Sequence, residues 1–167
     1  LSEDGEYLRR LRVQTDTGRH TTLHRIRDRR KGAAMSETII RGHIGIGPTV
    51  EGIAPSAFDN FSTRYDLDRD RGIVSRPSHK LYGENYVGRI LVLNAAKGGV
   101  ASAWMLREMV MKEKAPLGLL LNDANPVMAQ GAAFAQMPLI DRFETEITAA
   151  IKSGDRIIVD PAQGLVR

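Results

Sequence analysis

The sequence contains no cysteine, and aromatic residues account for only 5% of its 167 positions. Disulfides are therefore excluded, and a chain of this length can bury a core without them. No apolar run approaches the roughly 18 residues of a membrane helix, and the arginine-rich N-terminus lacks the apolar core of a secretory signal. We expect a cytoplasmic protein without a membrane partner.

Excess charge is also absent from most of the chain. Residues 1–34 hold nine Lys or Arg and five Asp or Glu, so fifteen residues of each sign remain for residues 35–167. The net charge of +4 thus belongs to the N-terminal leader alone. A neutral domain suits a small-molecule ligand better than a polyanion, so a nucleic-acid partner is not expected.

The leader, residues 1–34, has three possible origins. It starts with Leu, and Met35 follows it directly, as in upstream sequence translated from a mis-assigned start. An arginine-rich targeting segment would be poor in acids, and a basic arm for nucleic acid would interleave aromatic side chains that stack on bases. The composition favours the first origin, and we interpret residues 1–34 as a disordered or spurious leader to a domain at 35–167.

The domain shows the pattern of an α/β fold. Alternation predicts a half-buried strand over 38–46, with Ile40, Ile44 and Ile46 on its inner face. The polar stretch 54–80 is expected to be a long functional loop that packs through its aromatic side chains. Regular elements then follow: strands at 89–93, 117–121 and 139–140, helices at 100–112, 126–136 and 144–152, and a hairpin at 156–166. These elements predict a central βαβαβ unit with flanking strands that form a partly barrel-like sheet.

The segment 94–102 is the strongest candidate for a ligand site. It follows a buried strand and opens a helix, where free backbone N–H groups and the helix dipole favour an anion. Gly98 and Gly99 leave those amides accessible. Lys97 adds a positive charge, and Ser102 places a hydroxyl in the first helical turn. We predict a site for a carboxylate or a phosphate; the simpler alternative is a tight turn beside a solvated lysine.

Other polar residues are weaker candidates. Arg64 lies in the long loop, where it can reach a ligand or remain a surface residue. His43 and His79 lack the spacing of metal ligands, so no metal site is expected on this chain. Trp104, beside the apolar stripe of its helix, indicates either a partner surface or ordinary packing.

Across residues 40–167 the sequence resembles the small swivel subunit of aconitase X, without large gaps. The motifs that carry the resemblance are Tyr82 to Leu93, the glycine-containing turn, Lys114-Ala-Pro116, Asn125-Pro126, Gly131-Ala132, and Val159-Asp160 with Gly164. The resemblance implies an aconitase-type swivel domain, a flattened α/β fold that closes over a larger partner.

The resemblance also implies a function. Members of the family pair with a large subunit that carries an iron or iron–sulfur centre, and they eliminate water from hydroxy acids. We therefore expect a hydro-lyase subunit in a heterodimer, inactive without its partner, that acts on a small hydroxy acid such as cis-3-hydroxy-L-proline. This chain lacks cysteine thiolates, so the cofactor is expected on the partner. The alternatives are a mevalonate 5-phosphate dehydratase subunit and a non-catalytic regulatory or structural module.

One position departs from the family pattern. The turn of well-described members contains a serine that is expected to remove the proton next to the carboxylate, and Gly99 occupies that position here. Glycine has no side chain that accepts a proton. Ser102, nearly one helical turn further on, is the candidate catalytic residue in its place. The alternatives are Lys97, the partner subunit, or a variant reaction in this branch of the family.

Overall fold

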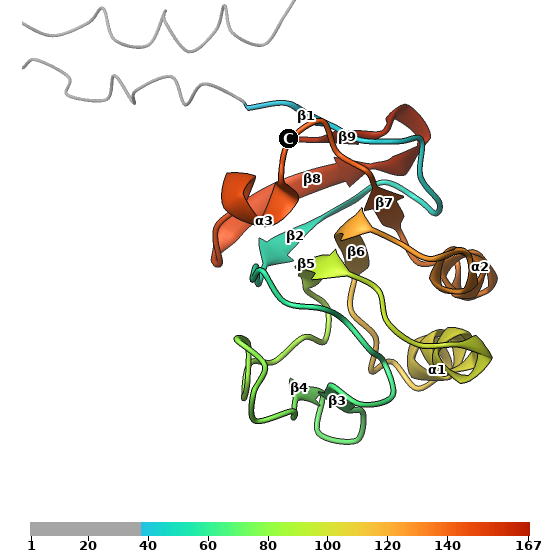
Figure 1. Ribbon diagram of the computed structural model, residues 1–167. Helices are drawn as coiled ribbons and strands as arrows, with labels where there is room; N and C mark the ends of the chain where they lie inside the picture. Colours follow the sequence, from blue (N-terminus) through green and yellow to red (C-terminus); the bar gives the residue numbers. More distant parts are fainter. Residues whose placement is uncertain (1–37) are drawn as a thin grey trace, which may run out of the picture. The chain divides into compact units, whose positions relative to one another are not determined.

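The computed structural model describes residues 38–167, so the predicted leader 1–34 lies outside the described residues. Within the described part, two sheets and two longer helices form successive layers (Figure 1). No helix in this part of the chain is both long and apolar enough to cross a membrane.

The central layer is a parallel sheet in the order β5-β6-β7. Its strands are β5 (Ile90–Ala95), β6 (Gly118–Asp123) and β7 (Leu139–Asp141), connected by α1 (Val100–Met111) and α2 (Pro126–Ala135). This arrangement is the predicted βαβαβ unit. Parallel strands need such helical crossovers, and the near-continuous apolar runs of β5 and β6 reflect burial on both faces.

Side chains of the parallel strands alternate between two hydrophobic cores. Leu91, Leu93 and Leu121 pack toward α1 and α2, where Leu106 and Met109 are among their buried neighbours. The intervening side chains face the second sheet and the short α3 (Ile147–Ala150) instead: Ile90, Val92, Leu120 and Ile140. The parallel sheet therefore separates a helix layer from a sheet layer.

The second sheet is antiparallel, in the order β1-β9-β8-β2. Its strands are β1 (Ile40–Arg41), β9 (Leu165–Val166), β8 (Asp155–Asp160) and β2 (Val50–Ala54). The predicted hairpin at 156–166 corresponds to β8 and β9, joined by a single 3-10 turn.

Two segments pass from the antiparallel sheet to the edges of the parallel sheet. After β2, Ser56 and Phe61 form parallel bridges to Val92 and Ala96, along the outer edge of β5. After β1, Ile46 forms an antiparallel bridge to Leu139, on the outer edge of β7. These connections give the domain its partly barrel-like character, although neither sheet closes on itself.

The predicted strand over 38–46 is wrong in extent. Only Ile40–Arg41 forms a strand, and Ile44 is 79% exposed instead of lying on the inner face. The reason is that the chain changes partner: the N–H of Gly42 donates to Gly164 O, and that of Ile46 to Leu139 O. The residues between these two bonds cross from one sheet to the other, so alternation does not hold there.

Other boundaries also differ from the sequence prediction. The helix predicted over 144–152 is the single turn of α3: Glu146 caps its start by accepting from the Thr148 N–H, and the backbone is already extended at Ile151. In the long loop, Phe61 is buried, whereas Phe58 and Tyr65 are exposed. The loop also contains a short hairpin, β3 (Leu67–Asp68) with β4 (Ile73–Val74).

Candidate functional site

The candidate turn lies at the carboxyl end of β5, where it is fixed by the long loop. The Phe61 N–H donates to Ala95 O at 2.8 Å, and the Lys97 N–H donates back to Phe61 O at 2.7 Å. A ligand in an open parallel sheet typically binds at this end of the strands. The predicted turn is thus located where the fold favours a site.

The two glycines of the turn have different roles. Gly98 has a φ of +115°, and a Cβ there would collide with the hydroxyl of Ser102. Gly99 is the N-cap of α1 with an ordinary φ of −112°, and a Cβ there would have no atom within 4 Å. Gly98 is therefore required by conformation and space, whereas Gly99 leaves room for a side chain.

The N-terminus of α1 has unused hydrogen-bond donors. No side chain from residues 38–167 caps this helix. Among the described residues, no partner is found for the backbone N–H groups of residues 98–101, while the Ser102 N–H donates to Gly99 O. By contrast, the N-terminus of α2 is capped by Asn125 Oδ1, which accepts from the Met128 N–H at 2.8 Å. The free amides and the helix dipole make the start of α1 suited to an anion.

The predicted site residues occupy different environments. Lys97 is exposed, and Ser102 is buried at 3% exposure with its hydroxyl against Gly98. Arg64 is exposed, and its guanidinium lies over the Tyr65 ring, 5.4 Å from the centroid. The structure thus brings Lys97, Ser102 and the two glycines together by chain connectivity, and it shows Arg64 in contact with Tyr65.

A line of amide side chains crosses the carboxyl ends of the strands, and sequence reasoning missed it. Asn94 Nδ2 donates to Asn60 Oδ1 at 3.1 Å, and Asn122 Nδ2 donates to Asn94 Oδ1 at 3.2 Å. Asn122 also holds α3, because it donates to Glu146 Oε1 and accepts from the Ile147 N–H. The available signal was one asparagine directly after each of two apolar runs, at strand ends that share an edge.

A cluster of charged groups lies on the long loop, on both sides of Phe61 in the sequence, and sequence reasoning also missed it. Arg76 Nε donates to Asp66 Oδ1 at 2.6 Å, and its Nη2 donates to Asp59 Oδ1 at 3.0 Å. Burial would raise the pKa of Asp59, but hydrogen bonds from two backbone N–H groups and from Arg76 outweigh burial and lower that pKa below its ordinary value. The cluster fixes the loop that borders the turn.

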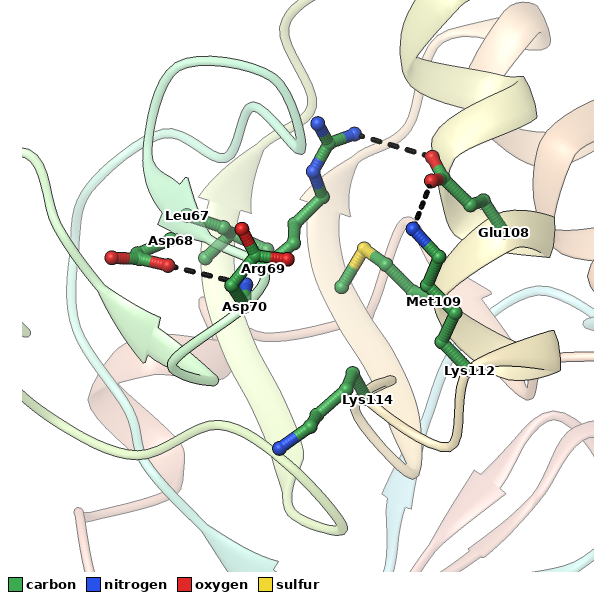
Figure 2. Close-up of a pocket in the computed structure, with 8 residues that line it drawn as sticks. All are labelled: Leu67, Asp68, Arg69, Asp70, Glu108, Met109, Lys112 and Lys114. Atoms are coloured by element: carbon green, nitrogen blue, oxygen red, sulfur yellow. Dashed lines mark hydrogen bonds and ion pairs between the residues drawn. The ribbon is translucent and has the colours of Figure 1, made fainter.

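A separate pocket of about 250 Å³ lies between the β3–β4 hairpin and the second half of α1 (Figure 2). Three of the six charged side chains that line it, Arg69, Glu108 and Lys112, pair with one another. Glu108 lies 3.6 Å from the Arg69 guanidinium and 2.6 Å from the Lys112 ammonium, which lowers the pKa of Glu108. Because acidic and basic side chains line it in equal number, this pocket offers less to an anion than the candidate turn does.

The described residues do not offer a metal site. No group of three or more His, Asp or Glu side chains in this part of the chain is arranged to hold an ion. His79 is buried and its Nδ1 accepts from the Leu81 N–H, so it acts within its own loop. The donor set of the described domain therefore does not fit an iron–sulfur cluster, and the whole sequence contains no cysteine.

Comparisons with known proteins agree with this fold. The family model of the aconitase X swivel domain matches residues 39–167. The phosphomevalonate dehydratase small subunit of Methanocella arvoryzae is 30% identical over 127 residues, which cover 76% of this chain and 96% of that protein. The same-named subunit of Methanococcoides burtonii is 30% identical over 129 residues, 77% of this chain and 90% of that protein.

A solved structure also shares the fold. The crystal structure of Thermococcus kodakaraensis aconitase X in its holo-form superimposes with a TM-score of 0.72 at 24% identity, and the match covers 78% of this chain and 98% of that chain. At this identity the likeness concerns the fold. It agrees with the two-sheet arrangement described above.

Proposed function

Since this chain belongs to the aconitase X swivel-domain family, we propose that it is the small subunit of a two-chain hydro-lyase that dehydrates mevalonate 5-phosphate. The single observation that carries the proposal is the uncapped start of α1 at the carboxyl end of β5, beside Lys97. The relatives named phosphomevalonate dehydratase small subunit favour this substrate over cis-3-hydroxy-L-proline, the first expectation from the sequence.

The turn would bind an anionic group of the substrate. Mevalonate 5-phosphate carries a carboxylate and a phosphate, and either group suits the free amides at residues 98–101. Lys97 would add a positive charge, and because its side chain is exposed it could move to contact the bound ligand. Binding there would orient the carbon from which the proton leaves and, on closure over the partner, would exclude water.

Two side chains of this chain and a residue of the partner subunit are the candidate acceptors of the substrate proton. Gly99 offers no side chain, and the space above it is open. The candidates are Ser102, whose hydroxyl lies against Gly98, Lys97, and a residue of the partner subunit. In the elimination, the proton moves to this acceptor, the electron pair forms the carbon–carbon double bond, and hydroxide departs to give water with one further proton.

An iron or iron–sulfur centre, if the complex uses one, would belong to the large subunit. This chain has no thiolate, and its described residues hold no cluster of other ligands. Its own contribution would therefore be anion binding, orientation and exclusion of water, together with proton removal where Ser102 or Lys97 is the acceptor.

The test is anaerobic co-expression of the full chain with its large subunit, followed by assays on mevalonate 5-phosphate and cis-3-hydroxy-L-proline. We expect dehydration of the phosphate-bearing substrate that requires both chains. Lys97→Met should raise KM about tenfold, as for the loss of one charge-assisted bond. The matched control is Lys152→Met, because among the described residues the Lys152 ammonium bonds to Ala149 O alone.

A second candidate function is a non-catalytic regulatory module, and the absent side chain at Gly99 favours it. It predicts a stable complex in which Lys97→Met and Ser102→Ala leave the turnover of the large subunit unchanged. Activity on cis-3-hydroxy-L-proline alone would instead contradict the proposed substrate but retain the reaction class.

A further inference from the structure

Two buried hydroxyls from different segments meet at the turn. Ser102, in the first turn of α1, is 3% exposed, and its Oγ lies where a side chain at Gly98 would be. Ser62, on the loop segment beside β5, is 4% exposed, and its Oγ lies 3.9 Å from the position that a Gly98 Cβ would take. The start of α1 is thus bordered by a second hydroxyl that the sequence does not indicate.

The Ser62 hydroxyl has no hydrogen-bond partner among the described residues. Its backbone is fully used, because the Ser62 N–H donates to Asp66 Oδ2 at 2.7 Å and its carbonyl accepts from the Asp66 N–H at 3.0 Å. A buried hydroxyl without a partner is unfavourable, and native structures keep few such groups. A ligand that accepts from this hydroxyl would remove the penalty.

The surrounding charges leave the hydroxyl proton free for an anion. Asp66 is the carboxylate that accepts from the Ser62 backbone, and each of its oxygens has a donor: the Ser62 N–H for Oδ2 and the Arg76 guanidinium for Oδ1. Arg76 also balances Asp59. Ser62 is therefore held by a rigid, paired cluster while its Oγ remains available beside the free amides of α1.

We propose that Ser62 is a ligand-binding residue of this site, whose Oγ–H donates to the same oxyanion that the amides of residues 98–101 bind. The oxyanion is a carboxylate or a phosphate oxygen of the substrate. This inference rests on the proposed function for the identity of the ligand, and it assigns a residue from a different segment to the site.

The experiment is a titration of the full chain, labelled with ¹⁵N, with inorganic phosphate and separately with acetate. We expect saturable shifts of the amide resonances of Gly98, Gly99 and Val100 with at least one of the two anions. Ser62→Ala should weaken that binding about tenfold, and Ser62→Thr, which keeps a hydroxyl, should recover most of it.

The matched control is Ser56→Ala. Ser56 also has a buried hydroxyl without a partner, in the same loop. It pairs with Val92, whereas Phe61 pairs with Ala96, so it lies about 13 Å further back along the strand. Ser56→Ala should leave the anion affinity unchanged. Urea unfolding of each variant would show that the fold is retained.

The outcomes separate the two proposals. Absence of anion-dependent shifts at residues 98–101 would overturn the inference, and so would equal losses in Ser62→Ala and Ser56→Ala. Phosphate binding would identify the phosphate end of the substrate as the group held here, and acetate binding the carboxylate end. The titration measures anion binding by this chain alone, and the dehydratase assay measures turnover by the two-chain complex. Either experiment can therefore succeed while the other fails.

Discussion

Gly131 of α2 packs directly on Ala103 of α1: a Cβ added to Gly131 would lie 2.6 Å from the Ala103 Cα and 2.7 Å from its Cβ. Real Cβ atoms do not approach other atoms this closely, so the two helices touch through their backbones at this point. Figure 1 shows α1 and α2 next to each other on one side of the parallel sheet. The contact fixes α1 relative to α2, and with it the turn from which α1 starts.

Gly131→Ala is expected to destabilise the domain by about 1–3 kcal/mol, because the added methyl group must push the helices apart. Helix propensity alone would predict a gain of about 1 kcal/mol for the same change. The sign of the shift in the urea midpoint therefore decides between the two effects. A more stable variant would show that the helices separate without cost.

Replacement of Gly98 by serine and replacement of Gly99 by serine should change the stability of the domain in opposite directions. Gly99→Ser adds a side chain in open space at the N-cap of α1, so we expect stability to rise by a few tenths of a kcal/mol. Gly98→Ser meets the Ser102 hydroxyl at a positive φ, and we expect a loss of about 1–3 kcal/mol. Thermal unfolding of both variants measures the difference, and equal stabilities would contradict the described turn.

Removal of the Arg76 guanidinium should be more costly than removal of an exposed one. Arg76→Met leaves Asp66, whose side chain is 5% exposed, without its ion-pair partner, and we expect a loss of about 2–3 kcal/mol. The control is Arg156→Met: Arg156 is 72% exposed and pairs with Glu51 at the surface, so its loss should cost less than about 1 kcal/mol. Similar urea midpoints for the two variants would show that the Arg76 cluster is not structural.

Stability should depend on pH through Asp59, because its folded-state pKa is lowered. A lowered carboxyl pKa contributes stability above the unfolded value of about 3.9, and that contribution is lost as the pH falls through the folded pKa. In urea unfolding between pH 7 and pH 3, the stability gap between wild type and Asp59→Asn should narrow below about pH 4. A gap that stays constant over this range would contradict the assignment.

The sequence was sufficient where one physical signal dominates. The apolar runs at 89–93 and 117–121 led directly to β5 and β6, and Asn125 before Pro126 located the start of α2. The sequence prediction was wrong where hydrogen-bond partners far away in the chain determine the local structure. Ile44 is exposed because the chain changes sheets there, and local alternation carries no information about that change.

The same distinction applies to the site. The glycine-rich turn follows from local sequence, whereas the different requirements at Gly98 and Gly99 follow only from their surroundings in the folded chain. Ser62 lies far from the turn in sequence, and its position depends on the pairing of Phe61 with Ala96. A register between a loop and a strand cannot be obtained from the composition of either segment.

The two segments that leave the antiparallel sheet have a further effect. An open strand edge is a template for pairing with another chain and thus for aggregation. In the part of the chain that the structure describes, the outer edge of β5 is bridged by Ser56 and Phe61 and that of β7 by Ile46. The parallel sheet is therefore shielded from strand addition on both sides, so a large subunit that engages this sheet would meet side chains and helix ends instead of an open backbone edge.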